Sequence, residues 1–196
     1  MKLYITPWSP YARKCRIVLR EKGLLGRCDE IVVDPFVEEA AIAAANPVAQ
    51  VPALVTDEGV KLTNSPLICA WLDRLGPPRL IPDGEAQWPV RRLEALADAA
   101  QEMGVKLLLE KRRPEAERSP HWTTRWRNGL DRALDALEAW DIDPEAFDLG
   151  VISTGCCITW IGFRHPEIDV VGPRPRLRAL QATLEARPSF LETAPL

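Results

Sequence analysis

The sequence is poor in the residues on which metal centres and disulfide frameworks depend. Among its 196 residues there are two histidines and five cysteines, and the cysteines have neither C-x-x-C spacing nor a regular spacing to histidine. Zinc sites and secreted disulfide frameworks both need such spacing. We therefore expect no metal and interpret the cysteines as buried thiols of a protein in a reducing compartment, the cytoplasm.

Charge of one sign and long apolar runs are also scarce. Lysine and arginine number 25 and aspartate and glutamate 28, which gives a net charge of -3, whereas nucleic-acid binding needs a clustered excess of cations. The most apolar late stretch, residues 151–163, is well short of the roughly 20 residues that a membrane helix needs. The start of the chain, MKLYITPWSPYARK, lacks the apolar core of a signal peptide. We expect neither nucleic acid nor a membrane as a partner.

Residues 1–75 alternate between short apolar runs and helix-like segments. Strands are predicted at 3–5, 31–33, 53–55 and 60–62, and helices at 10–23, 36–45 (ended by Asn46-Pro47) and 65–75. Between the last two strands, Thr56-Asp57-Glu58-Gly59 predicts a hairpin turn in which Gly59 takes a positive φ. The order β-α-β-α-β-β-α, a parallel βαβ unit with an added antiparallel hairpin, predicts a thioredoxin-like α/β fold.

The chain changes character after residue 76. Residues 77–84 form a stiff linker rich in proline and glycine, and no convincing strand follows it. Apolar residues at three- and four-residue steps predict helices at 90–112, 122–140 and 174–186, and the segment 151–163 is apolar nearly all round, as in the central helix of a bundle. We predict a thioredoxin-like domain over residues 1–76, the linker at 77–84 and an all-helical domain over 85–196.

Several local segments add a family resemblance to this layout. They are SPYARKCRIVLREKGL (residues 9–24), NPVAQVPALVTDEG (46–59) and LTNSPLICAWLD (62–73), followed in the second domain by EALAD (94–98), RSPHW (118–122), LDALE (134–138), GFRHPEID (162–169) and RPSF (187–190). Over essentially the whole chain, their order and spacing resemble those of the cytosolic glutathione S-transferases, above all bacterial members of the serine type. The resemblance implies the two domains described above, glutathione as co-substrate without a metal, and a homodimer.

The resemblance implies a catalytic role for Ser9. This residue stands at the expected N-cap of the first helix, directly before Pro10. A hydroxyl that donates a hydrogen bond to sulfur, at the positive end of a helix, favours the thiolate of glutathione. The thiolate is the nucleophile that would attack a small hydrophobic electrophile. From the residues alone, a serine before proline is an ordinary helix cap, and this structural role is the alternative.

Five further residues match the family's glutathione-binding motifs. The Val51 backbone, before a cis Val51–Pro52 bond, would pair with the cysteinyl backbone of glutathione, and Ser65 would bind the γ-glutamyl carboxylate at a helix N-terminus. Relatives often have a basic residue in place of Gln50 and usually Glu or Asp in place of Asn64, so two charged anchors are amides here. A trans proline and a plain helix cap at Ser65 are the structural alternatives.

Two groups of residues remain. An apolar pocket for the electrophile is expected between the domains, with candidate lining residues Trp8, Tyr11, Met103 and Leu107, plus His121 or Trp122; each also fits a core or surface position. Cys15 is expected to be a buried structural thiol, and Cys156 and Cys157 inert filler of an apolar helix that Asp148 caps.

The leading interpretation is therefore a glutathione transferase. Glutathione-dependent isomerisation, peroxide reduction or reductive cleavage would use the same thiol. A catalytically silent binding or regulatory protein that retains the fold is a further alternative, favoured by the uncharged Gln50 and Asn64. Fold alone does not decide among these functions, because function resides in the site.

Overall fold

A computed structural model describes residues 1–143 and 145–195 of the chain. The chain forms two compact units, one made of Met1–Pro82 together with Ala186–Leu196 and the other of Asp83–Glu185. The segment after residue 185 thus groups with the first unit, whereas the sequence predicts a helical domain that extends over residues 85–196.

A four-stranded mixed sheet forms the centre of the first unit. Its strands are β1 (Lys2–Ile5), β2 (Asp29–Val32), β3 (Ala53–Val55) and β4 (Lys61–Thr63), in the spatial order β2-β1-β3-β4. β2 pairs with β1 in parallel, and β3 pairs antiparallel with both β1 and β4. The hairpin turn before β4 has φ of 80° at Gly59, as predicted. The β-α-β-α-β-β-α order of a thioredoxin-like α/β fold is confirmed.

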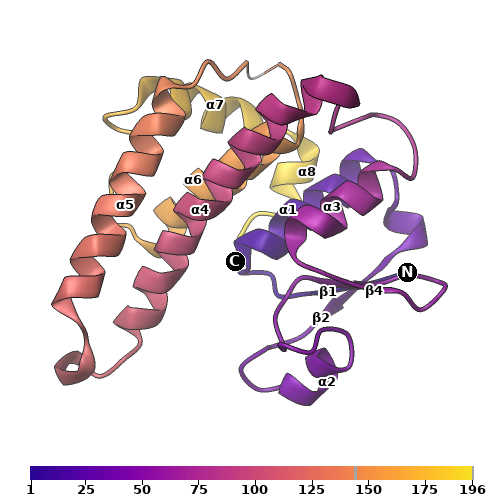
Figure 1. Ribbon diagram of the computed structural model, residues 1–196, viewed down its shortest axis with the longest axis horizontal. Helices are drawn as coiled ribbons and strands as arrows, with labels where there is room; N and C mark the ends of the chain where they lie inside the picture. The colour runs from indigo at the N-terminus through magenta and orange to yellow at the C-terminus, as the bar shows by residue number, and fades with distance from the viewer. Residues whose placement is uncertain (144, 196) are drawn as a thin grey trace. The chain divides into compact units, whose positions relative to one another are not determined.

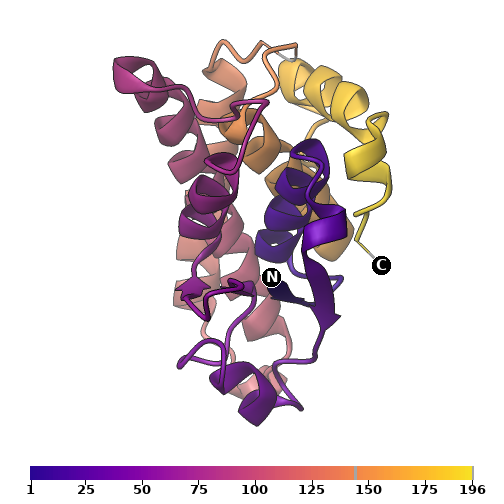
Figure 2. The same ribbon diagram turned by 90° about the vertical axis from the view of Figure 1, so that its right-hand side faces the viewer.

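Three helices pack around this sheet, α1 (Pro10–Glu21), α2 (Glu39–Ala43) and α3 (Ser65–Asp73). Figures 1 and 2 both show α1 and α3 on one side of the sheet and α2 on the other. α1 buries Ala12, Cys15, Val18 and Leu19, the apolar positions whose helical spacing predicts it. The sheet is therefore covered on both faces.

The predicted helix over residues 36–45 is wrong in extent, because only Glu39–Ala43 are helical. The Asp34 carboxylate accepts a hydrogen bond from the Phe36 N–H at 2.9 Å, and the Asp34 N–H donates to the Glu38 carboxylate at 2.8 Å. Such side-chain bonds offer the backbone a turn in place of a helix. The acidic side chains thus delay the start of α2.

A buried ion pair between the ends of α1 and α3 holds the segment that follows α3 in place. Lys22 Nζ lies 3.1 Å from Asp73 Oδ1, and both side chains are almost fully buried. The Asp73 carboxylate also accepts hydrogen bonds from the N–H groups of Leu80 at 2.8 Å and Ile81 at 3.3 Å. The Pro77–Pro78 bond in between is cis, which the sequence did not predict. Part of the predicted linker is therefore packed within the first unit.

The second unit is helical in its described residues, with α4 (Gln87–Lys111), α5 (Pro120–Ala139), α6 (Leu149–Arg164) and α7 (Pro175–Glu185). Short 3-10 helices cover Leu25–Arg27 in the first unit and Gly84–Ala86 and Glu115–Glu117 in the second. α6 is buried along most of its length, as predicted for a central helix. The Asp148 carboxylate caps it by accepting a hydrogen bond from the Val151 N–H at 2.9 Å, which confirms the expected cap.

α4 and α6 pack closely and run in parallel. A Cβ atom added at Gly150 would lie 2.9 Å from the Leu93 Cβ, and one added at Gly104 would lie 3.2 Å from the Trp160 ring. Leu93 of α4 contacts Gly150 of α6, and Gly104 further along α4 contacts Trp160 further along α6, so the two helices run in the same direction. α5 lies beside α4 in Figure 1 and packs against it.

The last described segment adds α8 (Pro188–Leu191) to the first unit. The Arg13 guanidinium donates to the Phe190 carbonyl at 3.1 Å and lies 5.1 Å from the centroid of the Phe190 ring. The Glu21 carboxylate accepts hydrogen bonds from the Ser189 hydroxyl at 2.6 Å and the Arg187 guanidinium at 3.1 Å. α1 therefore contacts α8 as well as α3.

Candidate functional site

Three distant segments of the chain meet at one end of the sheet. In the registers of the strands, Tyr4, Ala53 and Thr63 form one row across β1, β3 and β4. Beyond this row the chain leaves β1 toward the turn before α1, enters β3 from the loop 46–52 and leaves β4 into α3. Neighbouring strands are only about 4.8 Å apart. The segments that carry the predicted glutathione-binding residues are therefore neighbours.

Ser9 lies in the turn between β1 and α1 and caps the helix. Its Oγ accepts a hydrogen bond from the Ala12 N–H at 3.2 Å, and its own N–H donates to the Thr6 carbonyl at 3.1 Å. Pro10 is the first helical residue. A hydroxyl has one hydrogen and two lone pairs, so the capping bond leaves the Ser9 O–H able to donate to another acceptor. Because Ser9 is only half-buried, an atom of a ligand can reach it.

Asn46 holds the loop before β3, a role that the sequence does not predict. Asn46 Nδ2 donates to the Gln50 carbonyl at 2.7 Å, and its Oδ1 accepts from the Val48 N–H at 3.2 Å. Ala49 between them has φ of 50°, which is uncommon for a residue with a side chain. The Val51–Pro52 bond is cis, as the family resemblance implied. Asn46 thus positions the backbone that carries Val51.

Asn64 has an unusual backbone conformation at the entrance to α3. Its φ is 75° and its ψ 124°, and its side chain makes no capping bond. Conformations of this kind cost on the order of 1–3 kcal/mol, and asparagine tolerates a positive φ better than most residues. Ser65 follows as the first residue of α3 and is 3% exposed. Asn64 holds the N-cap position, so Ser65 is not a plain helix cap.

Two helix N-termini lie at this end of the sheet. α1 begins directly after Ser9 and α3 begins at Ser65, and the two helices touch where Cys15 Sγ donates to the Ser65 carbonyl at 3.9 Å. The unpaired N–H groups of a first turn act as roughly half a positive charge and attract anions. Gln50 and Asn64 add amide groups but no charge. Chemically, this arrangement suits a thiolate and a carboxylate.

The residues predicted to line the electrophile pocket fall in both units. Trp8, in the turn after β1, and Tyr11, in the first turn of α1, are half-buried. Met103 is half-buried and Leu107 is buried, one turn apart on α4. A pocket shared by these four residues stays a prediction.

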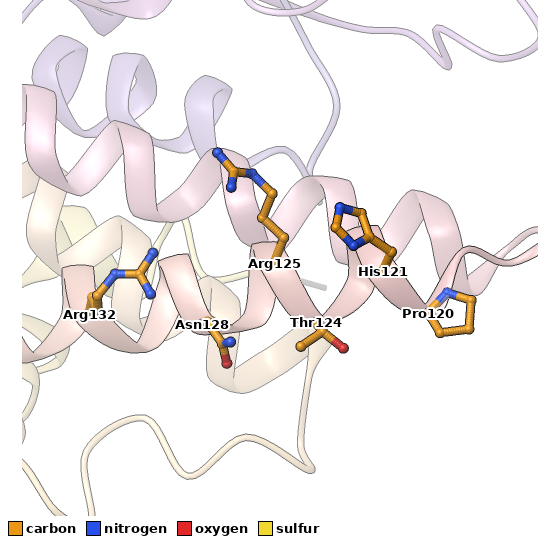
Figure 3. Close-up of a pocket in the computed structure, with 6 residues that line it drawn as sticks. All are labelled: Pro120, His121, Thr124, Arg125, Asn128 and Arg132. Atoms are coloured by element: carbon orange, nitrogen blue, oxygen red, sulfur yellow. The ribbon is translucent and has the colours of Figure 1, made fainter.

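A pocket of about 550 Å³ lies elsewhere, on α5. Figure 3 shows its lining residues along this one helix; they are Pro120, His121, Thr124, Arg125, Asn128 and Arg132. By helical periodicity they lie opposite the buried Leu130, Leu134 and Leu137. None of the predicted glutathione-binding residues lines this pocket, and His121 is its one residue in common with the electrophile candidates. We therefore do not place the reaction there.

Metal-binding and membrane-spanning features are absent from the described residues. No group of three or more His, Cys, Asp or Glu residues among them could hold a metal ion, and no helix among them is long and apolar enough to cross a membrane. The five cysteines are buried and form no disulfide, as expected. Burial raises the pKa of Cys28 to about 11 and also raises the pKa of Cys157. These two thiols therefore stay protonated near neutral pH.

Known proteins resemble both the first unit and the whole chain. The family model for the N-terminal domain of glutathione S-transferases matches residues 3–79. YibF, an uncharacterized GST-like protein of Escherichia coli (strain K12), is 33% identical over 201 residues, which cover 100% of this chain and 98% of YibF.

Solved structures agree over the full length. A glutathione S-transferase from Methylobacillus flagellatus with glutathione bound has a TM-score of 0.93 and 32% identity, covering 100% of this chain and 99% of its own. A glutathione transferase family member from Pseudomonas fluorescens Pf-5 with bound glutathione has a TM-score of 0.95 and 34% identity, covering 100% of this chain and 98% of its own. Together with the Escherichia coli relative, which spans both units, these matches show that the chain belongs to the glutathione S-transferase family.

Proposed function

We propose that this protein is a glutathione transferase that binds glutathione where β1, β3 and β4 end and stabilises its thiolate for attack on a small hydrophobic electrophile. The observation that carries the proposal is Ser9, which caps α1 while its hydroxyl hydrogen stays available. Two relatives at 32% and 34% identity hold glutathione in their solved structures, which supports glutathione as the co-substrate.

In this proposal the central cysteinyl residue of glutathione and its γ-glutamyl end each have an anchor. The Val51 backbone pairs with the cysteinyl residue, and Ser65 at the start of α3 binds the γ-glutamyl carboxylate. Gln50 and Asn64 contribute hydrogen bonds without charge. The electrophile lies against the candidate residues Trp8, Tyr11, Met103 and Leu107. The protein works as a cytoplasmic homodimer, the commonest symmetric assembly.

The proposed chemistry depends on the charge of the glutathione sulfur. A free thiol of this kind has a pKa near that of cysteine, about 8.5. A hydrogen bond to a charged group contributes about 1.5–3 kcal/mol, and about 1.4 kcal/mol corresponds to one pKa unit. A hydrogen bond donated by Ser9, together with the N-terminus of α1, therefore lowers the pKa of the glutathione thiol enough for the thiolate to predominate near neutral pH. Ser9 keeps its proton, the thiol proton passes to water, and the sulfur forms a bond to the electrophilic carbon as the leaving group departs.

Replacement of Ser9 tests this mechanism. In Ser9→Ala, we expect kcat/KM for conjugation to fall roughly 10- to 100-fold, the loss of one hydrogen bond to a charged sulfur. The measurement is steady-state conjugation of glutathione with a panel of electrophiles.

Ser119→Ala is a matched control. Ser119 also precedes a proline at the first position of a helix and accepts a capping hydrogen bond, from the Trp122 N–H at 3.4 Å. Both variants lose about 1 kcal/mol of stability with the cap, but the control keeps full conjugation. Unchanged turnover in Ser9→Ala would remove Ser9 from the mechanism.

A catalytically silent protein with the glutathione transferase fold is the second candidate, because Gln50 and Asn64 put uncharged amides at two positions where relatives often carry charged anchors for glutathione. Titration calorimetry with glutathione separates the two functions. The absence of heat at millimolar glutathione favours the silent protein. Binding without conjugation of any electrophile favours an isomerase, peroxidase or reductase that uses the same thiolate.

A further inference from the structure

Two buried thiols are in contact between α1 and α3, the helices whose N-termini belong to the candidate glutathione site. The Sγ atoms of Cys15 in α1 and Cys69 in α3 are 3.7 Å apart, and both residues are 0% exposed. Cys15 Sγ also donates to the Ser65 carbonyl at 3.9 Å. The pair therefore joins the helix that Ser9 caps to the helix that begins at Ser65.

We propose that Cys15 and Cys69 are a site of oxidative modification, where a hydroperoxide converts the two thiols into an intramolecular disulfide that weakens the glutathione site. The first step oxidises one thiol to a sulfenic acid and reduces the hydroperoxide to an alcohol, or to water for hydrogen peroxide. The second sulfur then attacks the first, and water leaves as the S–S bond forms. Two thiols and one hydroperoxide thus give one disulfide, one alcohol and one water.

The geometry selects this pair of cysteines. A sulfenic acid on either sulfur already touches the thiol that resolves it. Cys156 and Cys157 are adjacent in sequence, but successive side chains of a helix point about 100° apart, so a bond between them would disrupt α6. Because Cys15 and Cys69 are buried, peroxide reaches them only when α1 or α3 opens locally. Oxidation is therefore slower than that of an exposed thiol.

The disulfide acts on the site through α3. It brings sulfurs that are now 3.7 Å apart to about 2.05 Å. Cys69 lies one helical turn after Ser65, so movement of Cys69 is passed to the first turn of α3. A disulfide sulfur carries no hydrogen, and the Ser65 carbonyl loses the donor that Cys15 provides. This effect on affinity rests on the function proposed above.

The test oxidises the full-length protein with hydrogen peroxide, measures its intact mass, and only then blocks the remaining thiols for peptide mapping. We expect the intact mass to fall by about 2 Da, and peptide mapping to find residues 15 and 69 joined. Displacements on the order of 1 Å cost an active site up to about 100-fold, and we expect glutathione to bind about tenfold more weakly by calorimetry. Reduction with dithiothreitol restores both mass and affinity.

Alanine variants serve as controls. Cys15→Ala and Cys69→Ala abolish the linked peptide, whereas Cys28→Ala, in the same unit, keeps it. An unchanged mass of the wild-type protein after peroxide treatment, or linkage of any other pair, overturns the proposal without depending on how a variant folds. Oxidation with unchanged glutathione affinity overturns the effect on the site. A reduced protein that forms the disulfide but never binds glutathione refutes the proposed function and leaves the modification site standing.

Discussion

His165 shows, for a single residue, how burial decides the charge of a side chain. It follows α6 and is 0% exposed. Its Nε2 lies 2.9 Å from the Gly104 carbonyl, which can only accept, so Nε2 carries the hydrogen. Nδ1 then accepts from Lys111 Nζ at 2.9 Å, and Lys111 also pairs with Glu167. The neutral ring satisfies both neighbours. Burial lowers the pKa of His165, and the Lys111 charge lowers it further.

The stability of the protein should therefore fall as the pH is lowered from about 7 to about 5. In the unfolded chain His165 takes up a proton near pH 6.5, whereas the folded protein, with its lower pKa, takes it up only at a more acidic pH. The unfolded state binds more protons in this window, and acid stabilises it relative to the native state. Urea unfolding at a series of pH values measures this slope.

Two glutamine variants isolate the contribution of His165. His165→Gln keeps a donor for the Gly104 carbonyl and removes the titration, so the pH profile flattens. His121→Gln makes the same substitution at the other histidine of the chain, which is exposed, and serves as the matched control. A slope in His165→Gln equal to that of the wild type would assign the pH dependence to other groups.

At the scale of helices, the contact between α4 and α6 explains why glycine occurs inside helices where alanine would be more favourable. Glycine costs about 1 kcal/mol relative to alanine in a helix interior, and Gly104 weakens the helical pattern of its segment. The Trp160 ring and the Ile161 side chain occupy the space where a Gly104 Cβ would point, at 3.2 and 3.3 Å. Their helices approach closely because these positions have no side chain.

We predict opposite effects for two glycine-to-alanine changes in α6. A Cβ at Gly150 would lie 2.9 Å from both the Leu93 Cβ and the Val90 carbonyl oxygen, so Gly150→Ala should lower the free energy of unfolding by about 1–3 kcal/mol. Gly162 has no neighbouring atom within 4 Å of such a Cβ, and Gly162→Ala should raise it by up to about 1 kcal/mol. Urea unfolding measures both, and shifts of the same sign would contradict this account of the contact.

Across the whole molecule, the chain returns to its first unit after completing the second. The residues after 185 rejoin Met1–Pro82 through α8, whose Phe190 is 1% exposed. Phe190 packs under the Arg13 guanidinium, and its carbonyl accepts a hydrogen bond from the same group. The core of the first unit is therefore assembled from both ends of the described chain.

Truncation of Phe190 should destabilise the first unit strongly. We expect Phe190→Ala to lower the free energy of unfolding by about 3–5 kcal/mol, as for other buried aromatic side chains. Leu191→Ala is the control. Leu191 is next to Phe190 in the sequence but is 62% exposed, so loss of its side chain costs less than about 0.5 kcal/mol. Hydrogen exchange of the α1 and β1 amides localises the effect. Equal protection of these amides in the two variants would show that α8 does not support the first unit.

The sequence predicts best what local chemistry decides. Gly59 in its turn and Ser9 as the cap before Pro10 are signals within a few residues, and the positive φ and the helix cap are both confirmed. The cis bond at Pro52 was expected only through the family resemblance, since most X-Pro bonds are trans. The hydrogen bonds of the Asn46 side chain to its loop are not predicted, because the sequence Asn-Pro is equally typical of a helix end. The packing of α8 against the first unit is not predicted, because a helix of four residues is too short to show a periodic pattern of buried positions.

The return of the chain through α8 sets an order for folding during synthesis. Chains usually fold their N-terminal domain first as they leave the ribosome. Here the ribosome must translate all of Asp83–Glu185 before the residues that complete the earlier unit exist. Until then the surface of α1 that Phe190 covers is open to chaperones and to other nascent chains.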